Sequence, residues 1–188
     1  MDELFFYLQN EKSNRAYEDF FGFAGRHPAD VDAIDELMPT EEQFNTFVKA
    51  LKAVSPASIY FVEMGDRNGV YGHRENEINI SWKLSPVMLI RATLHEMAHA
   101  ILHPWPGGVK PEQELPRAVR ETEAEGVAYL VCMNYGLDVG AYSLDYIQSW
   151  IRHLTPDEAE WSLALAERTA KRIVAAIDAE LERQSLEQ

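Results

Sequence analysis

The sequence predicts an α+β fold that is mostly helical overall, in which a small antiparallel sheet precedes a long helix and further helices. Apolar residues recur at helical spacing before residue 57 and after residue 85, whereas β-branched and aromatic residues dominate between 58 and 82. No internal repeat or long linker interrupts the 188 residues. We therefore expect a single domain over residues 1–188, with a helical N-terminal extension (1–57) and a core (58–188).

The N-terminal extension is expected to form helices separated by short turns. An apolar cluster of phenylalanines comes first, and a short acidic helix is expected over residues 29–38. Thr40 and Gln43 then have the spacing of a capping box, in which each side chain accepts a hydrogen bond from the other residue's backbone N–H. The helix that they begin ends before Ser55 and Pro56. Its apolar face consists of Phe44, Phe47, Val48 and Leu51.

Three strands are expected after this helix. Residues 58–64 and 77–82 are rich in β-branched and aromatic side chains, and residues 70–73 predict a shorter strand between them. Residues 65–69 and 74–76 supply the glycine, asparagine and aspartate that turns favour. Because such short turns join neighbouring strands, the expected product is a small antiparallel sheet.

A long helix follows the strands. Ser85 suits an N-cap and Pro86 suits the first helical turn. The helix must end near Pro104, because proline lacks the backbone N–H that would continue it. Residues 105–116 contain two glycines and three further prolines and therefore predict a loop.

Three more helices complete the chain. The first is expected over residues 117–135, ended by Gly136, and a shorter one over residues 142–154. Thr155 and Glu158 form a second capping box at the start of the last helix. Its apolar stripe predicts a packing face, which consists of Leu163, Ala166, Ala170, Ile173, Ile177 and Leu181.

Charge and composition exclude several classes of protein. The chain has 17 basic and 31 acidic side chains and a net charge of −14, without the cluster of Lys and Arg that a nucleic-acid interface requires. The single cysteine, Cys132, lies in an apolar helical run, where a buried and inert thiol is expected. The N-terminus does not have the pattern of a signal peptide, and no stretch is apolar for the length of a membrane span. A cytoplasmic location is therefore expected.

The long central helix carries the residues on which the functional hypothesis depends. His95 and His99 are four residues apart, so they lie one turn apart on one face of the helix, and Glu96 adjoins the first of them. This HExxH spacing provides two nitrogen ligands for zinc and a carboxylate beside a bound water. The alternative is a helix with two surface histidines and no metal.

A catalytic zinc site requires a third protein ligand. His103 lies on the same face, but eight residues separate it from His95, which is about 12 Å along the helix axis. Imidazole nitrogens must lie about 2 Å from the ion, so His103 is excluded as a ligand. It is expected to support a ligand, to line the cleft, or to interact with the helix dipole as a terminal histidine.

The helix over residues 117–135 supplies the better third ligand. We assign Glu121, because it lies at the edge of the apolar face, whereas Glu123 points away from that face. Glu125, one turn after Glu121, could accept the outer N–H of a ligating histidine. The alternative is a solvated acidic first turn. The apolar face consists of Ala124, Val127, Ala128 and Val131.

These motifs resemble those of known metallopeptidases. TLHEMAHAILH followed by ETEAEGVAYL is similar to the ImmA/IrrE-like family, although Glu125 stands for its Asn or Asp and Val127 for its Phe. The closer resemblance is to the metallopeptidase half of ArdC-type antirestriction proteins, which also covers YSLDYIQSWI (residues 142–151). The first fifty or so residues match neither family, and the single-stranded-DNA-binding half of ArdC-type proteins has no counterpart in the chain. The resemblance implies a zincin-like fold and one Zn²⁺ ion.

The resemblance also implies how such a site would act. Glu96 would be the general base, and an edge strand beside the cleft would align a peptide substrate by β-addition. The candidate for this strand consists of Glu77, Ile78, Asn79, Ile80 and Ser81. The donor that stabilises the oxyanion is left open among Tyr71, His73, Tyr129 and His153.

Three functions follow from these observations. The first is a zinc-dependent endopeptidase that cleaves a protein substrate, such as a phage or mobile-element regulator. The second is a metal-stabilised antirestriction or interaction protein that acts by binding. The third is a helical domain without a metal. The presence of Glu96 favours the first, because a structural zinc site has no use for a general base. Neither a nucleic-acid nor a membrane partner is expected.

Overall fold

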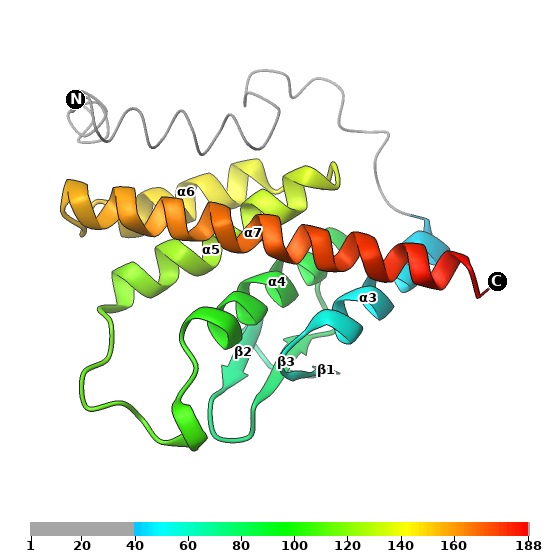
Figure 1. The fold of residues 1–188 in the computed structure, drawn as a ribbon, viewed down its shortest axis with the longest axis horizontal. Coiled ribbons are helices and arrows are strands. Elements are labelled where there is room, and N and C mark those ends of the chain that lie inside the picture. Colours follow the sequence, from blue (N-terminus) through cyan, green and yellow to red (C-terminus); the bar gives the residue numbers. More distant parts are fainter. Residues whose placement is uncertain (1–39, 188) are drawn as a thin grey trace.

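The computed structural model describes residues 40–187 and confirms an α+β fold that is mostly helical. The predicted phenylalanine cluster and the predicted helix over residues 29–38 lie outside the described residues. Figure 1 shows a small sheet on one side of a layer of helices, with the longest helix crossing the molecule. The elements are, in order, α3 (Glu41–Val54), β1 (Ser58–Val62), β2 (Gly69–Gly72), β3 (Glu77–Ser81), α4 (Pro86–Leu102), a 3₁₀ turn (Pro106–Gly108), α5 (Arg117–Asn134), α6 (Gly140–Ile151) and α7 (Pro156–Ser185).

The sheet is mixed, and the prediction of an antiparallel sheet was wrong for one strand. The strand order is β1-β3-β2, so β3 is the central strand and β2 and β1 are the edges. β2 and β3 form the expected antiparallel hairpin, but β1 pairs with β3 in parallel, with Ile59 opposite Ile78. The segment between β1 and β2 is longer than a tight hairpin turn, which allows the chain to cross to the far side of β3.

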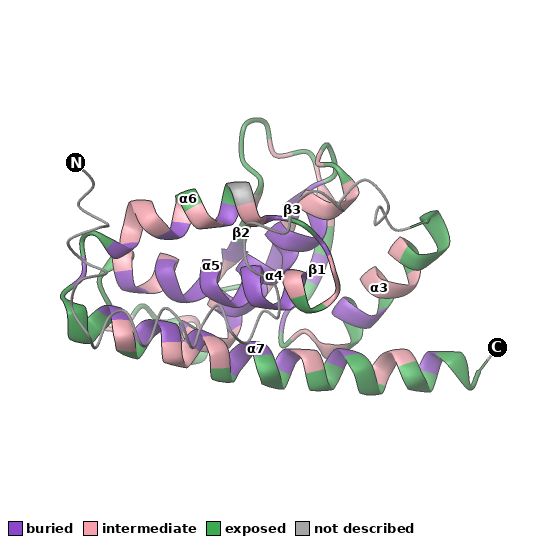
Figure 2. Cartoon of the chain, turned by 90° about the horizontal axis from the view of Figure 1, so that it is seen from above, coloured by how far each residue is buried: buried purple, intermediate pink, exposed green. Residues whose placement is uncertain are grey.

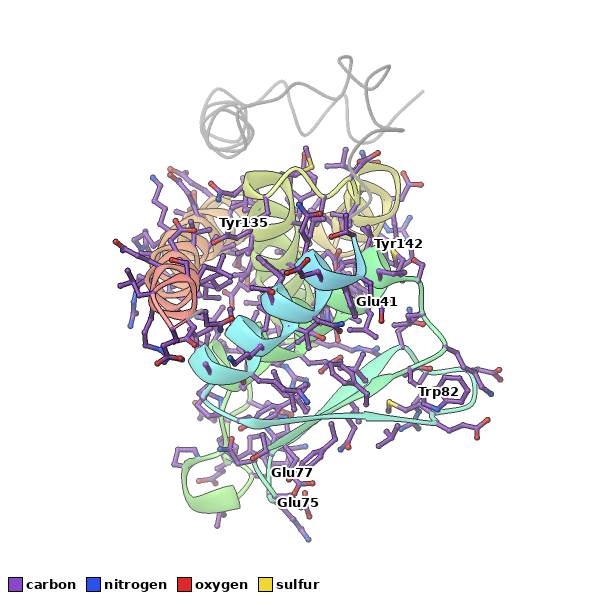
Figure 3. All side chains as sticks on the ribbon, turned by 90° about the vertical axis from the view of Figure 1, so that its right-hand side faces the viewer. Glu41, Glu75, Glu77, Trp82, Tyr135 and Tyr142 are labelled. Atoms are coloured by element: carbon purple, nitrogen blue, oxygen red, sulfur yellow. The ribbon has the colours of Figure 1, made fainter. Side chains whose placement is uncertain are left out.

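One face of the sheet is covered by α4. Ile59, Ile78 and Ile80 are buried on this face, together with Tyr71 of β2. The other face is open, because Tyr60 opposite Asn79 is 45% exposed. Figure 3 shows Trp82, just after β3, on the side of the molecule away from α7. The edge of β2 therefore lies beside α4, the helix that carries the HExxH motif.

α5 is the central helix of the fold. It packs against α4, α6 and α7, and Figure 2 shows it as a largely buried helix between α6 and α7. Every residue from 122 to 132 is buried, including Glu123 and Glu125. The sequence interpretation with a single apolar face was therefore wrong for this helix. Because neighbours surround α5, its carboxylates on every side are held within the protein.

The boundaries of the helices follow local sequence. The capping boxes of Thr40 with Gln43 and of Thr155 with Glu158 are both present, and α4 follows Ser85 and has Pro86 in its first turn. The stripe along α7 is buried from Leu163 to Ile177. Cys132 is fully buried, which raises the pKa of its thiol, as expected for an inert cysteine. Within residues 40–187, no helix combines the length and the apolar character that a membrane crossing needs.

Candidate metal centre

Two neighbouring helices bring three ligand atoms together. α4 carries His95 and His99 one turn apart, and α5 carries Glu121. The Nε2 atoms of the two histidines lie 3.2 Å apart, and Glu121 Oε2 lies 3.5 Å from Nε2 of His95 and 4.0 Å from Nε2 of His99. All three ligand atoms fall within 4.8 Å of one another. These side chains form a cluster that could hold a metal ion.

The three ligands differ in how they hold a proton. Burial would lower the pKa of His95, but hydrogen bonds with Glu121 and Glu125 raise it to about 9. Burial and the neighbouring charge of His95 lower the pKa of His99 to about 2. Burial would raise the pKa of Glu121, but its contact with His95 lowers it to about 2. A metal ion that binds here would therefore displace a proton from His95. The affinity of the protein for the metal ion should increase as the pH rises towards 9, because less proton then competes for His95.

A buried ion pair holds the ring of His95. Nδ1 of His95 lies 2.8 Å from Glu125 Oε2, so an Nδ1–H donates to this carboxylate and leaves Nε2 facing the cluster. Arg91 also donates to Glu125 through Nε, at 2.9 Å, and through Nη2. The side chains of Arg91 and Glu125 are only 4% and 0% exposed, so each depends on the other for its hydrogen bonds. The guanidinium also stacks on Tyr142, 4.1 Å from the ring centroid.

A second chain of contacts holds the ring of His99. Its Nδ1 lies 2.9 Å from Nδ1 of His103, whose Nε2 lies 2.8 Å from Glu123 Oε2. A ligating His99 must leave Nε2 bare, so its proton is on Nδ1 and donates to His103. His103 then donates its own Nε2–H to Glu123, which also accepts a hydrogen bond from Ser162 of α7 at 3.2 Å. His103 therefore contacts His99 and lies outside the cluster of His95, His99 and Glu121.

Glu121 is oriented by two neighbours. The hydroxyl of Tyr146 on α6 donates to Oε2 at 3.1 Å, and Nε of Arg117 donates to Oε1 at 3.3 Å. Both carboxylate oxygens therefore have a partner before any metal binds. Burial and the negative charge of Glu121 raise the pKa of the Tyr146 phenol to about 12, so it remains a donor at neutral pH.

Glu96 lies against the edge of β2. It accepts a hydrogen bond from the backbone N–H of Tyr71, and burial raises its pKa despite the opposing charge of His95. Gly69 leaves room for it, because a Cβ there would lie 3.0 Å from Glu96 Cγ and 2.8 Å from Ile80 Cδ1. A raised pKa makes a carboxylate a better proton acceptor than an ordinary glutamate.

A cleft of about 340 Å³ opens over this cluster. The three ligands and Glu96 lie in its wall, and β2 forms one side with Gly69, Val70 and Tyr71. The candidate aligning strand, Glu77–Ser81, is the central strand β3 and is paired on both sides, so that assignment was wrong. The free edge beside the cleft belongs to β2, because β3 is already hydrogen-bonded to two strands.

The four residues proposed as oxyanion donors separate into two groups. Tyr71 and His73 line the cleft, but the Tyr71 hydroxyl donates to Asn76 and the His73 ring stacks on Trp105. Tyr129 is buried and His153 is exposed, and neither lines the cleft. Tyr146 lies in the cleft wall and already donates to a ligand.

Sequence reasoning missed Arg91 and Tyr146, and it set Glu123 aside as pointing away from the apolar face. Arg91 lies one turn before His95 on α4, and the available signal was a single charged residue within the otherwise uncharged run from Pro86 to Leu94, since a buried arginine needs a partner. Tyr146 lies in the segment YSLDYIQSWI, which was noted for its resemblance alone. For Glu123 no local signal existed, because its partner His103 is two helical turns beyond His95 on another helix.

Comparisons with known proteins leave the family open. No protein-family profile matches the chain, and no solved structure matches it significantly. A Bacillus anthracis protein, whose name describes it as uncharacterized, is 32% identical over 90 residues. That match covers 47% of this chain and 15% of the other protein, so the chain spans far less than two thirds of this relative. The relative's name states no activity.

Proposed function

We propose that this protein is a zinc-dependent endopeptidase. The observation that carries the proposal is the convergence of His95, His99 and Glu121 within 4.8 Å, with Glu96 in the same cleft. Three protein ligands and an open side towards a cleft are typical of catalytic zinc sites, whereas structural sites are closed by four. The resemblance of both helical motifs to metallopeptidases supports the same conclusion.

The donor set and its spacing suit zinc. Tetrahedral zinc with bonds of about 2.0–2.1 Å separates neighbouring ligand atoms by roughly 3.3 Å. The observed separations of 3.2, 3.5 and 4.0 Å surround that value. Two imidazoles and one carboxylate are a common ligand set of hydrolytic zinc enzymes. The outer nitrogens of both histidines are hydrogen-bonded, which keeps Nε2 of each available.

The chemistry divides between the ion and the side chains of the cleft. A zinc ion bound there supplies Lewis acidity, which lowers the pKa of water and polarises a peptide carbonyl. Glu96 would take the proton of the attacking water on its carboxylate and return it to the leaving amine nitrogen. Tyr146 would be a hydroxyl donor for the developing oxyanion, because it lines the cleft and contacts Glu121 of the ligand set.

The free edge of β2 supports a peptide as substrate. An extended peptide can add to an exposed strand by backbone hydrogen bonds, and β2 presents such an edge to the cleft, with the N–H of Tyr71 already held by Glu96. Glu96 lies beside this edge through its contact with the Tyr71 N–H. A peptide on β2 would therefore pass next to the general base.

The proposal is tested by Glu96→Gln, which keeps the size of the side chain but removes the base. The zinc-loaded wild-type protein should cleave members of a randomised peptide library, detected by mass spectrometry. The variant should bind as much zinc but cleave at least about 100-fold more slowly, the usual contribution of a positioned base. Glu112→Gln, on the exposed loop before α5, is the matched control and should behave as the wild type.

Two outcomes would contradict the proposal. If Glu96→Gln cleaves as fast as the wild type, Glu96 is not the base. If the zinc-loaded wild type cleaves no member of the library, the protein is not an endopeptidase and the alternative, a metal-stabilised protein that acts by binding, is favoured.

Gly69→Ala tests whether the base depends on its place against β2. The added methyl would lie 3.0 Å from Glu96 Cγ and should displace the carboxylate. Because small displacements of reacting groups are costly, we expect cleavage to fall roughly 10- to 100-fold while zinc content is unchanged. Gly72→Ala on the same strand is the control, since its Cβ would meet the flexible Glu75 side chain at 3.2 Å. Equal rates for both variants would contradict this role of Gly69.

A further inference from the structure

The cleft is locally basic in an acidic protein. Acidic side chains outnumber basic ones by 31 to 17 in the sequence. Nevertheless, Arg67, Arg117 and Arg120 line the cleft, and within residues 40–187 its acidic lining residues are Glu96 and Glu121, which belong to the candidate centre. Among the residues that line the cleft, arginines therefore outnumber carboxylates, which is the reverse of the balance in the whole protein.

The arginines lie on two sides of the centre. Arg67 is in the turn that leads into β2, and its backbone is held there by a hydrogen bond from its N–H to Met64 O at 3.2 Å. Arg117 and Arg120 are in the first turn of α5. Arg120 lines the cleft together with His73, which directly follows the last residue of β2. A peptide on β2 would thus have a guanidinium near each end of a stretch of roughly 10 Å.

These guanidinium groups retain unused donors. Arg67 is exposed and forms no ion pair with any residue that the structure describes. Arg120 pairs with Glu114 through Nη1 at 3.0 Å, but its side chain lines the cleft and is 21% exposed, so part of its guanidinium remains accessible there. Arg117 uses Nε for Glu121, and its side chain is 69% exposed. Guanidinium groups with free donors are well suited to bind carboxylates.

A peptide bound in the cleft is affected more by the charges of the nearby side chains than by the net charge of the protein. The Debye length is about 8 Å at physiological ionic strength, so most of the acidic surface is screened from a bound peptide. The net charge of −14 would slow the approach of an acidic substrate without preventing contact with the three arginines. Glu121 is engaged by His95, Tyr146 and Arg117, which further reduces repulsion within the cleft.

We propose that the cleft selects peptide segments with acidic side chains on both sides of the bond to be cut, with Arg67 binding on one side and Arg117 and Arg120 on the other. This inference rests on the proposed peptidase function for the position of that bond. The selection of acidic side chains itself is a binding property and can be measured without cleavage.

The experiment uses the full chain with Glu96→Gln, loaded with zinc and immobilised, to retain members of a randomised peptide library. Mass spectrometry should show Asp and Glu enriched over Asn and Gln by roughly fivefold, the upper range for exposed ion pairs. The enrichment should decrease as salt is raised. Adding Arg67→Gln or Arg120→Gln should each lower it about twofold to threefold. Arg74→Gln, an exposed arginine after β2 outside the cleft, should leave it unchanged.

Other results of this experiment would contradict either the charge selection or the peptidase function. Equal retention of acidic and amide peptides, or enrichment that survives both arginine variants, would overturn the inference. A single-stranded DNA oligonucleotide that displaces the acidic peptides at much lower concentration would overturn it in favour of a nucleic-acid ligand. The Glu96→Gln variant could retain acidic peptides preferentially while the wild type cleaves no peptide. This result would support the charge selection and contradict the peptidase function.

Discussion

Glu121→Ala is expected to lower zinc affinity by more than about 100-fold and to abolish cleavage. Loss of a residue that only supports a ligand typically costs 10- to 100-fold in metal affinity, so loss of a ligand should exceed that range. The substitution also removes the partner of Tyr146 and of Arg117. Zinc affinity is measured by competition with a chromogenic chelator, and circular dichroism checks that the protein remains folded.

The control for this variant is Glu112→Ala. Glu112 is an exposed glutamate shortly before α5, so its loss changes the net charge equally without reaching the cleft. Wild-type zinc affinity in Glu121→Ala would mean that α5 contributes no ligand. His103 could not replace Glu121, because its Nδ1 is turned to the outer nitrogen of His99 at 2.9 Å and its Nε2 to Glu123.

Arg91→Met should destabilise the protein by about 3 kcal/mol even without metal, because it removes one of the two cationic partners of the buried Glu125 carboxylate and both guanidinium hydrogen bonds, while His95 remains 2.8 Å away. For a domain of this size, that loss corresponds to a fall in Tm of roughly 10 °C. Thermal unfolding followed in the presence of EDTA separates this effect from metal binding. The double variant Arg91→Met, Glu125→Gln should recover part of the stability, since neither remaining side chain is charged and glutamine can still accept from His95.

Lys83→Met is the matched control for the buried pair. Lys83 and Glu63 also form an ion pair, but their side chains are 49% and 64% exposed. Its loss should cost less than about 1 kcal/mol, as is usual at the surface. A similarly small loss in Arg91→Met, or a double variant less stable than either single variant, would contradict the role given to the Arg91–Glu125 pair.

The acidic residues of α5 show how one helix can serve both histidines. Glu121 and Glu125 are one turn apart and contact the two nitrogens of the same ring, since Glu121 faces Nε2 of His95 and Glu125 faces Nδ1. Glu123, between them, is directed to His103 and so acts on His99. Alternate positions on a helix point to different sides. The three carboxylates therefore point in different directions. Each finds a partner inside the protein, because other helices enclose α5.

Much of the fold was predictable because its determinants are local. Both capping boxes, the first turn of α4 and the positions of the three strands follow from residues within a few positions of one another. The parallel pairing of β1 with β3 was not predictable, because it depends on the path of the connecting segment. This one difference places β2 rather than β3 at the free edge beside the cleft.

The sequence by itself determined that His95 and His99 share one face of a helix with Glu96 adjacent, and it indicated Glu121 as a companion. Helical geometry is sufficient for His95, Glu96 and His99, because the spacing of residues on one helix sets their relative positions. Glu121 lies on another helix, so its approach to the two histidines depends on the packing of α5 against α4. Only the tertiary structure decided that Glu123 supports His103 and that Arg91 neutralises Glu125. Such contacts join different helices, and their existence depends on how α4, α5 and α7 pack around one another.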